Sequence, residues 1–390
     1  MKSHLRAHIH CVPPALREVS LRVAEVDGIN LGQGICEMPV PEVVQQAAVE
    51  AIKKGLNRYC PAQGIAGLRE AIAQKLRAFN GIKVHTDDVL ITPGSTGAFE
   101  ALAQAFLEAG DEVISFKPFY PYHHNTLVHS KAEIKYVSLK PPEWNFNFEE
   151  LQAAFSDRTK FVLINTPNNP TGKVYSRNEL LFIGECCRKA GAFIVSDEVY
   201  EYMTYDGHNH ISPASLPELA DITITVGSYS KTFAITGWRI GYLTAPQKVL
   251  PYLRTVSDRA FVCAPTPFQH AVATGIIGLG DEYYCKLNAD LLRKREILAS
   301  GLKDAGFKFI EPQGAYYIFA DSSDAFPGMS SEDAVLKMIE TAHVGAVPAS
   351  DFLGLEVKGD PEKSRFMRFC FAVPDEKLER AGELLSNIRG

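Results

Sequence analysis

The sequence predicts an α/β protein in which helices cover a mainly parallel sheet. Short β-branched or apolar runs alternate with helix-length amphipathic segments through the first part of the chain, the rhythm of repeated strand–helix–strand units. After about residue 280 the pattern changes to longer helices between fewer strands. The 390 residues, 46% of them hydrophobic, are enough for two or three domains.

Six apolar runs predict the strands of the large sheet. They are Asp88–Thr92, Glu112–Phe116, Glu133–Leu139, Phe161–Asn165, Ala192–Ser196 and Asp221–Val226. Between them, amphipathic stretches predict helices, for example over Gly97–Ala109 and Asn178–Ala190. Active sites in such sheets lie beyond the carboxyl ends of the strands, so polar residues at those ends are candidates.

The C-terminal part predicts a smaller α+β domain. Its expected elements are, in order, helix Asp281–Ala305, strands Phe307–Ile310 and Ala315–Ala320, helix Ser331–Ala342, strand Arg365–Phe371 and helix Asp375–Ile388. The N-terminal stretch up to Met38 is expected to pack on this part. We therefore expect a large domain over residues 39–280 and a small domain formed by 1–38 and 281–390.

The charge and composition argue against nucleic-acid and membrane partners. The formal net charge is −6 and the pI is near 6.0, whereas phosphate backbones and anionic lipids require clustered Lys and Arg. No apolar run approaches the roughly 20 residues that span a bilayer. The segment Met1–Pro14 carries His and Arg where a signal peptide needs an apolar core, so the cytoplasm is the expected location.

The eight cysteines predict reduced, mostly structural thiols. None has a CxxC spacing, and the adjacent pair Cys186–Cys187 lies in a helical stretch where neighbours point to different faces. Neither a metal site nor a strain-free disulfide is expected there.

The segment Ser228–Gly241 places hydroxyl groups, Lys231 and Arg239 directly after a predicted strand. Such donors suit a phosphate, and a carbonyl-bearing cofactor needs an amine that can be neutral. Taken alone, a lysine in a loop of this kind is usually a solvated charge.

Three further turns follow predicted strands. Asn165–Gly172 contains Asn169 and is rich in turn-forming residues. Ser196–Tyr200 contains Asp197, which by itself reads as a helix N-cap. Thr92–Ala98 is a small-residue turn at a helix N-terminus, where free N–H groups suit an anion, although such turns are also common as connectors.

Four shorter motifs complete the set. Pro118–Pro121 contains Tyr120, which alone would be an ordinary core aromatic, and Met367–Phe371 contains Arg368, which alone would be a surface residue. The other two motifs are Leu31-Gly32-Gln33-Gly34 and Asn57-Arg58-Tyr59.

Together these segments, from about Gly32 to Phe371, resemble the fold-type I, class I aminotransferases that depend on pyridoxal phosphate (PLP). The Leu-Gly-Gln-Gly opening, the Asn-Thr-Pro-Asn-Asn-Pro-Thr-Gly turn and the Arg-Phe-Cys-Phe strand are most similar to the kynurenine and methionine aminotransferase branch.

The resemblance implies a set of catalytic residues on the cofactor ring. Lys231 would hold PLP as a Schiff base, Asp197 would face the pyridine nitrogen, and Tyr200 and Asn169 would donate to the ring oxygen. Tyr120 would lie over the ring. The implied phosphate-binding residues are Gly94, Ser95, Thr96, Ser228 and Arg239.

The resemblance also implies how substrate and subunits meet. Arg368 would grip the substrate α-carboxylate as a bidentate fork, and Gly34, with Asn169, would lie against the substrate. Tyr59 would reach the cofactor phosphate of a neighbouring subunit, which implies a homodimer with shared active sites.

The expected activity is transfer of an amino group from an L-amino acid to a 2-oxo acid through pyridoxamine phosphate, with ping-pong kinetics. Neutral, aromatic or thioether substrates are expected. However, Ile35-Cys36-Glu37-Met38 replaces the Phe-Pro-Asp-Phe type of sequence that lines the substrate entrance in that branch. A cysteine-conjugate β-lyase, an aspartate-type aminotransferase and a PLP-binding regulator remain alternatives.

Overall fold

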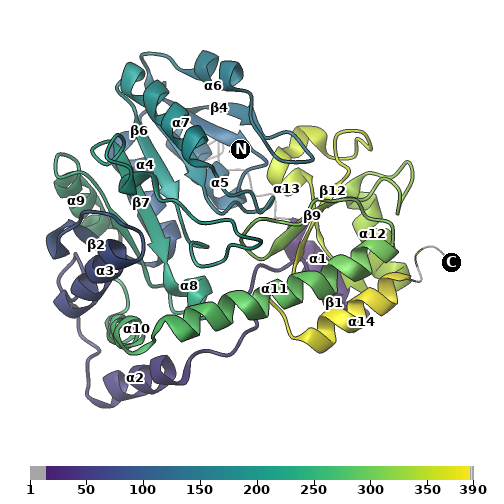
Figure 1. Cartoon of the computed structure of the whole chain (residues 1–390), viewed down its shortest axis with the longest axis horizontal. Helices are drawn as coiled ribbons and strands as arrows, with labels where there is room; N and C mark the ends of the chain where they lie inside the picture. The colour runs from purple at the N-terminus through teal and green to yellow at the C-terminus, as the bar shows by residue number, and fades with distance from the viewer. Residues whose placement is uncertain (1–14, 387, 389–390) are drawn as a thin grey trace, which may run out of the picture.

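The computed structural model of the chain describes residues 15–386 and 388. It has a large part and a smaller part, joined along the long helix α11 (Asp281–Asp304), as Figure 1 shows. The expectation about a signal peptide in Met1–Pro14 lies outside the described residues. Among the residues described, no helix has both the length and the apolar character needed to cross a membrane.

A seven-stranded, mainly parallel sheet forms the centre of the large part and confirms the predicted fold class. The strand order is β2-β8-β7-β6-β5-β3-β4, and only β8 runs antiparallel to its neighbours. The strands are β2 (Val89–Thr92), β3 (Glu112–Lys117), β4 (Glu133–Ser138), β5 (Thr159–Asn165), β6 (Phe193–Asp197), β7 (Thr223–Ser228) and β8 (Gly241–Thr244).

Helices cover both faces of this sheet, because its strands are apolar on both sides. In β5, Val162 belongs to the same hydrophobic cluster as Leu180 of α7 (Arg177–Ala190). Its neighbour Phe161 belongs to the cluster of Phe99 in α4 (Gly94–Phe106). Successive side chains of a strand point to opposite faces, so one apolar run anchors two layers of helices.

Local signals fix where the helices near the site begin and end. Ser176 and Glu179 form a capping box at the start of α7, and Gly191 ends it in the left-handed conformation. Helix α4 begins at Gly94, three residues before the expected start at Gly97. Its N-terminus therefore lies at the end of β2, beside the candidate site.

The smaller part combines both ends of the chain. Strand β1 (Ile29–Asn30) pairs in parallel with β10 (Val344–Gly345), and β11 (Val347–Pro348), β12 (Phe366–Cys370) and β9 (Tyr317–Asp321) form an antiparallel sheet. The helices here are α1 (Ala15–Glu25), α12 (Ser331–Ala342) and α14 (Asp375–Ser386). One hydrophobic cluster joins all of these elements except β11, whose Val347 belongs to a neighbouring cluster. The domain boundaries at residues 38/39 and 280/281 stay predictions.

The predicted strand Phe307–Ile310 is wrong. Only an isolated bridge between Lys308 and Asp321 forms there, and Ile310 is exposed. The segment leaves the edge of β9 after this one pairing, and Pro312 soon after it has no N–H to extend a ladder. The elements that the sequence analysis did not predict are α1, β1, β8, β10, β11, α2 (Glu42–Lys53), α3 (Ala66–Ala78), α5 (Pro121–Ser130), α6 (Phe148–Ala154), α8 (Tyr229–Thr232), α9 (Leu250–Phe261), α10 (Thr266–Gly278) and α13 (Ser350–Leu353).

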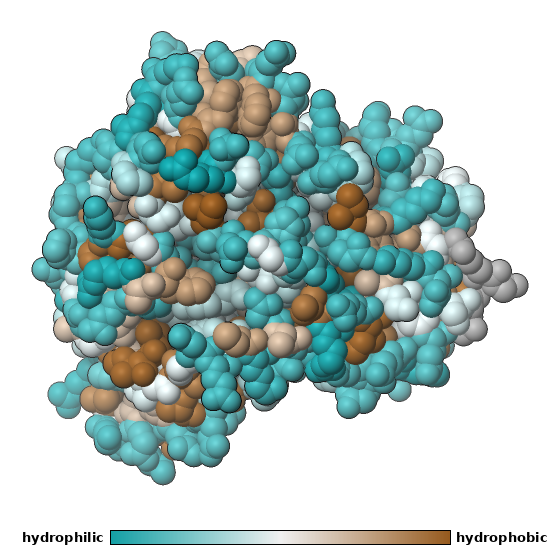
Figure 2. All heavy atoms as spheres, in the orientation of Figure 1, coloured by the Kyte–Doolittle hydropathy of each residue, from teal (hydrophilic) through white to brown (hydrophobic). Residues whose placement is uncertain are grey.

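The surface is mostly hydrophilic on the face shown in Figure 2, and its hydrophobic side chains gather in small patches. One such patch lies over α2 and α10, where Val49, Ile52 and Ile277 are exposed. Isolated apolar side chains are common on protein surfaces, but a group of them indicates a contact surface.

Candidate active site

The candidate site lies where three parallel strands end. Asn165 is the last residue of β5, Asp197 of β6 and Ser228 of β7. The register pairs Asn165 with Asp197 and Asp197 with Val226, so the three strand ends lie side by side. The N-terminus of α4 closes the site from the end of β2.

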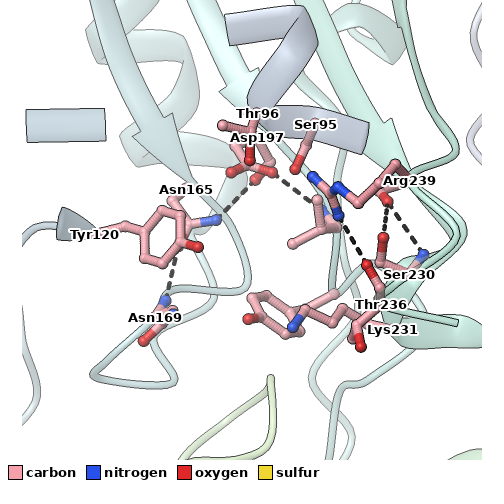
Figure 3. A pocket seen from close by; sticks show the side chains of 13 residues that line it. Ser95, Thr96, Tyr120, Asn165, Asn169, Asp197, Ser230, Lys231, Thr236 and Arg239 are labelled. Carbon is pink, nitrogen blue, oxygen red and sulfur yellow. Dashed lines mark hydrogen bonds between the residues drawn. The ribbon is translucent and has the colours of Figure 1, made fainter. Parts of the chain in front are cut away.

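These elements surround a pocket beyond the carboxyl ends of the strands, a usual position for small-molecule sites in such sheets. Figure 3 shows Tyr120 and Asn169 on one side and Lys231 and Arg239 on the other. Nine sequence-predicted residues line it: Ser95, Thr96, Tyr120, Asn169, Asp197, Tyr200, Ser228, Lys231 and Arg239. Gly34, Gly94 and Arg368 are not part of this lining, but each lies against one of its residues: Lys231, Arg239 and Asn169, respectively. Tyr59 does not belong to it, and its side chain is 84% exposed.

Among the residues that the structure describes, Lys231 has no acidic partner. Its Nζ donates a 2.8 Å hydrogen bond to the carbonyl oxygen of Gly34 and lies 5.6 Å from the centroid of the Tyr316 ring. Burial lowers its pKa from the usual 10.5 to about 8. A substantial fraction of this amine is therefore neutral near pH 8 and can act as a nucleophile.

Lys75 is also a buried lysine, but unlike Lys231 it has an acidic partner. Its Nζ forms an ion pair with Glu201 and contacts the Tyr242 hydroxyl at 3.3 Å. That contact satisfies its charge within the core, whereas Lys231 faces a pocket.

One end of the pocket offers several donors to an anion. A side chain at Gly94, whose φ is +71°, would place its Cβ 2.3 Å from Nη2 of Arg239, so only glycine permits this approach. The Arg239 guanidinium donates to the carbonyl oxygens of Thr236 at 2.9 Å and Pro93 at 3.4 Å. No ion pair of the described residues neutralises it. Together with the N-terminus of α4, this geometry suits a phosphate.

A carboxylate that lines the same pocket is held in a defined orientation. Oδ2 of Asp197 lies 2.9 Å from Nε2 of His123, and Oδ1 accepts a 3.3 Å hydrogen bond from the Val199 N–H. The Asn165 amide donates to the Asp197 carbonyl oxygen at 3.1 Å and accepts from the Asn169 N–H at 2.7 Å. The turn after β5 is thus tied to the end of β6.

Two tyrosines in the pocket are held in their protonated form. Burial raises the pKa of both Tyr120 and Tyr200 above the usual 10. The Tyr200 hydroxyl lies 3.2 Å from that of Tyr317, and the Tyr120 ring packs edge-on against His123. Each can therefore donate a hydrogen bond at neutral pH.

Arg368 reaches the site from β12 of the smaller part. Its Nη1 donates to Oδ1 of Asn169 at 3.0 Å, and its Nη2 donates to the Gly32 carbonyl oxygen at 2.7 Å. The guanidinium is buried and packs 4.3 Å from the centroid of the Tyr317 ring. Its Nε has no hydrogen-bond partner among the described residues, so the group retains capacity for an anionic ligand.

Sequence reasoning missed His123 and Asn165. His123 lies in the first turn of α5, three residues after Tyr120, which caps that helix and packs edge-on against the His123 ring, so a histidine shortly after the aromatic was an available signal. Asn165 is the first residue of the turn motif and the last of a strand, and position alone could have identified it.

The donors and acceptors of this pocket fit pyridoxal phosphate. An uncompensated amine, an anion-binding end and a fixed carboxylate correspond to the aldehyde, phosphate and pyridine nitrogen of that cofactor. A helix-covered parallel sheet carrying such a site defines a PLP-dependent enzyme of fold type I.

Comparison with known proteins identifies the family. The chain belongs to the aminotransferases of class I and II, whose family model matches residues 26–385, and it is a PLP-dependent aminotransferase. It is similar to kynurenine–oxoglutarate transaminase 3 of Rattus norvegicus, with 33% identity covering 94% of this chain and 86% of that protein. The methionine aminotransferase of Escherichia coli is 30% identical over 95% of each chain. Among solved structures, a single mutant of Thermus thermophilus aspartate aminotransferase matches with a TM-score of 0.90 and 30% identity, covering 99% of this chain and 100% of that one.

Proposed function

We propose that this aminotransferase moves the amino group of neutral L-amino acids, with aromatic or thioether side chains, to a 2-oxo acid in a ping-pong reaction. The names of two relatives, a kynurenine and a methionine aminotransferase, support this substrate class. The solved aspartate aminotransferase shows that the same fold also serves a dicarboxylate. The choice therefore depends on the charges around the pocket.

The observation that carries the proposal is the distribution of cations. Among the residues described, Lys231 and Arg239 are the cations that line the pocket, and Arg368 lies beside it. Lys231 is assigned to the cofactor aldehyde, Arg239 to the phosphate and Arg368 to the substrate α-carboxylate. The described part of the chain leaves no further arginine in the lining to pair with a side-chain carboxylate, which favours uncharged side chains.

Lys231 has the central role in the proposed mechanism. Its neutral amine would hold PLP through the cofactor aldehyde, and once free, Nζ would take a proton from the substrate Cα. When bound, PLP supplies an electron sink for the resulting negative charge. The 2.8 Å hydrogen bond to the Gly34 carbonyl oxygen keeps Nζ directed at the substrate side of the pocket.

Asp197 has an electrostatic role at the ring nitrogen. As a carboxylate fixed by His123 and the Val199 N–H, it favours a proton on that nitrogen. Tyr200 and Asn169 would donate to the ring oxygen, and Tyr120 would pack on the ring face. Gly94, Ser95, Thr96, Ser228 and Arg239 would bind the phosphate.

Arg368 would bind the α-carboxylate that all amino-acid substrates share. Its planar guanidinium is already oriented by Asn169 and the Gly32 carbonyl oxygen before substrate arrives. At Gly34, an added Cβ would lie 2.3 Å from the Tyr317 hydroxyl, so glycine keeps the chain close to the substrate.

A homodimer with shared sites is part of the proposal. Tyr59 is 84% exposed and does not line the pocket of its own chain, which suits a side chain that serves a neighbour. The exposed apolar patch over α2 and α10 offers a surface on which a second copy can pack. All seven cysteines of the described residues are free, which supports a reducing location such as the cytoplasm.

A half-reaction screen tests the substrate class. Amino acids are added one at a time to the PLP form, and the loss of cofactor absorbance is ranked by rate. Methionine, phenylalanine and kynurenine should react faster than aspartate and glutamate. Faster reaction with dicarboxylates would overturn the proposal. Sustained pyruvate release from a cysteine conjugate, with no 2-oxo acid present, would instead indicate the β-lyase.

A further inference from the structure

The two parts of the molecule touch beside the site at a short segment of the smaller part. This segment, Ser350–Val357, comprises α13 and a 3-10 turn. It lies against the turn that follows β3. The Phe119 N–H donates to the Phe352 carbonyl oxygen at 2.8 Å, and Nζ of Lys117 lies 2.5 Å from Oε1 of Glu356.

Aromatic side chains hold Lys117 in place. Its Nζ lies 4.6 Å from the centroid of the Tyr136 ring, and its side chain is 23% exposed against 63% for Glu356. His124 stacks on Phe119 with ring centroids 4.6 Å apart, and its Nδ1 lies 2.5 Å from the Tyr136 hydroxyl. The ammonium therefore starts from a restrained position, and pairing it costs less side-chain entropy than an ordinary surface pair.

Phe352, whose carbonyl oxygen contacts the turn after β3, also packs on Arg368. The Phe352 ring is fully buried, and the Arg368 guanidinium carbon lies 4.9 Å from its centroid. The Tyr317 ring lies 4.3 Å from the same carbon. Two aromatic faces thus pack on the guanidinium, and they restrict the plane in which its fork can present N–H groups to a carboxylate.

We propose that Lys117 is a positioning residue for substrate recognition: its ion pair with Glu356 holds the Ser350–Val357 segment against the turn after β3. This keeps Phe352 on Arg368 and the guanidinium in its carboxylate-binding orientation. The inference rests on the proposed role of Arg368. It assigns to Lys117 no contact with substrate or cofactor.

The turn after β3 contacts two sides of the site. Tyr120, in the same turn, lines the cofactor pocket. One short stretch of the large part therefore touches the cofactor side of the site directly and the substrate-binding arginine through Phe352. Loss of the ion pair should therefore loosen the connection to Arg368 and leave the position of Tyr120 at the cofactor side unchanged.

Equilibrium binding of 3-phenylpropanoate to the holoenzyme tests the inference. This probe has a carboxylate and an aromatic ring but no amine to react. Lys117→Gln and Glu356→Gln should each raise its Kd by about 1.5- to 5-fold, the range of a partly exposed ion pair. KM for the amino acid should rise in parallel, whereas kcat and bound cofactor should stay unchanged.

Charge reversal provides the rescue. Lys117→Glu and Glu356→Lys alone place like charges together and should weaken binding, and the double variant Lys117→Glu/Glu356→Lys should recover it. The matched control is Lys160→Gln. Lys160 forms an ion pair, at 3.2 Å, with Asp111, the residue that precedes β3 at the end of the strand away from the site. That variant should bind the probe normally.

The outcomes separate this inference from the proposed function. If Arg368→Lys weakens binding of the probe but Lys117→Gln binds it normally, the positioning role of Lys117 is wrong and the role of Arg368 stands. If Arg368→Lys does not weaken binding of the probe, the proposed role of Arg368 is wrong, and the positioning role that rests on it is wrong as well. Failure of the charge-swapped double variant to recover binding, or loss of cofactor from Lys117→Gln, would also overturn the positioning role.

Discussion

Nε2 of His123 lies 2.9 Å from Oδ2 of Asp197, and both side chains are buried. His123 comes from α5 and Asp197 from the end of β6, so the contact joins two layers of the large part. A buried carboxylate held from two sides, by this imidazole and by the Val199 N–H, cannot turn away from the pocket. Its orientation is therefore set before the cofactor binds.

Asp197→Asn should lower kcat by roughly 10²–10⁴-fold, the scale of a misplaced catalytic proton. The amide keeps the shape of the side chain but removes the charge that favours a protonated ring nitrogen. Steady-state kinetics at saturating PLP measures the loss. His123→Gln is the companion variant, because it keeps the carboxylate and removes one support. It should lose less activity than Asp197→Asn, and near-normal turnover in Asp197→Asn would show that another group controls the ring.

Borohydride reduction of the holoenzyme should attach the pyridoxyl label to Lys231. This amine is uncompensated and faces the pocket, whereas Lys75, although also buried, is bound by Glu201. Peptide mapping by mass spectrometry locates the label. Lys231→Ala should take up none and lose most of its activity. A label on Lys75 or any other lysine would contradict the assignment.

The low pKa of Lys231 makes the stability of the cofactor-free enzyme depend on pH. Burial lowers this pKa from 10.5 to about 8, so between these values the folded amine is neutral while the unfolded one is protonated. The unfolded state then binds more protons, and the free energy of unfolding rises with pH across this window. Below about pH 8 the buried charge destabilises the fold.

Comparison with Lys231→Met isolates this effect. Denaturant unfolding of the two cofactor-free proteins should show the variant to be more stable at pH 7. The difference should shrink as the pH rises from 8 to 10.5, because the wild-type amine loses its charge. A difference that is constant over this range would show that Lys231 is not the responsible group.

Arg368→Lys should lower kcat/KM by about 10- to 100-fold, because a charged hydrogen bond is worth roughly 1.5–3 kcal/mol. Lysine keeps the charge and loses the two-pronged geometry. The loss should be similar for every amino acid, since all share the α-carboxylate. PLP binding should be spared because Arg239, the proposed phosphate ligand, is held by Thr236 and Pro93 and not by the partners of Arg368. A changed ranking of substrates, or an enzyme empty of PLP, would assign Arg368 to specificity or folding.

Hybrid dimers test whether Tyr59 serves the neighbouring subunit. Tyr59→Ala and Lys231→Ala are mixed in equal amounts at limiting PLP after subunit exchange. If Tyr59 acts across the interface, each hybrid contains one intact site, and mixing should restore about one quarter of wild-type activity. No recovery would place Tyr59 in its own subunit's site or outside any site.

Much of the site could be predicted from sequence because its parts are local. The turns that carry Asn169, Asp197 and Lys231 each follow a strand, and the carboxyl ends of parallel strands meet at one edge of a sheet. The helix start at Gly94 and the left-handed turn there are likewise encoded by small residues next to each other.

Contacts between distant segments could not be predicted in this way. Nothing near Lys117 in the chain indicates Glu356, and nothing near His123 indicates Asp197 as its partner. The failed strand Phe307–Ile310 has the same cause, because its apolar pattern suits a strand but the edge of β9 accepts a single pairing there.

The sequence by itself therefore determined the fold class, the positions along the chain of six of the seven strands of the large sheet, and the residue types at the strand ends. This was possible because periodicity and turn chemistry act over a few neighbouring residues. Only the tertiary structure decided the orientation of those residues. Arg368 and Asn169 are 199 positions apart, and their 3.0 Å hydrogen bond forms only where β12 of the smaller part meets the turn after β5 of the large part. Likewise, the pKa of Lys231 near 8 comes from burial by both parts of the molecule, which no local pattern specifies.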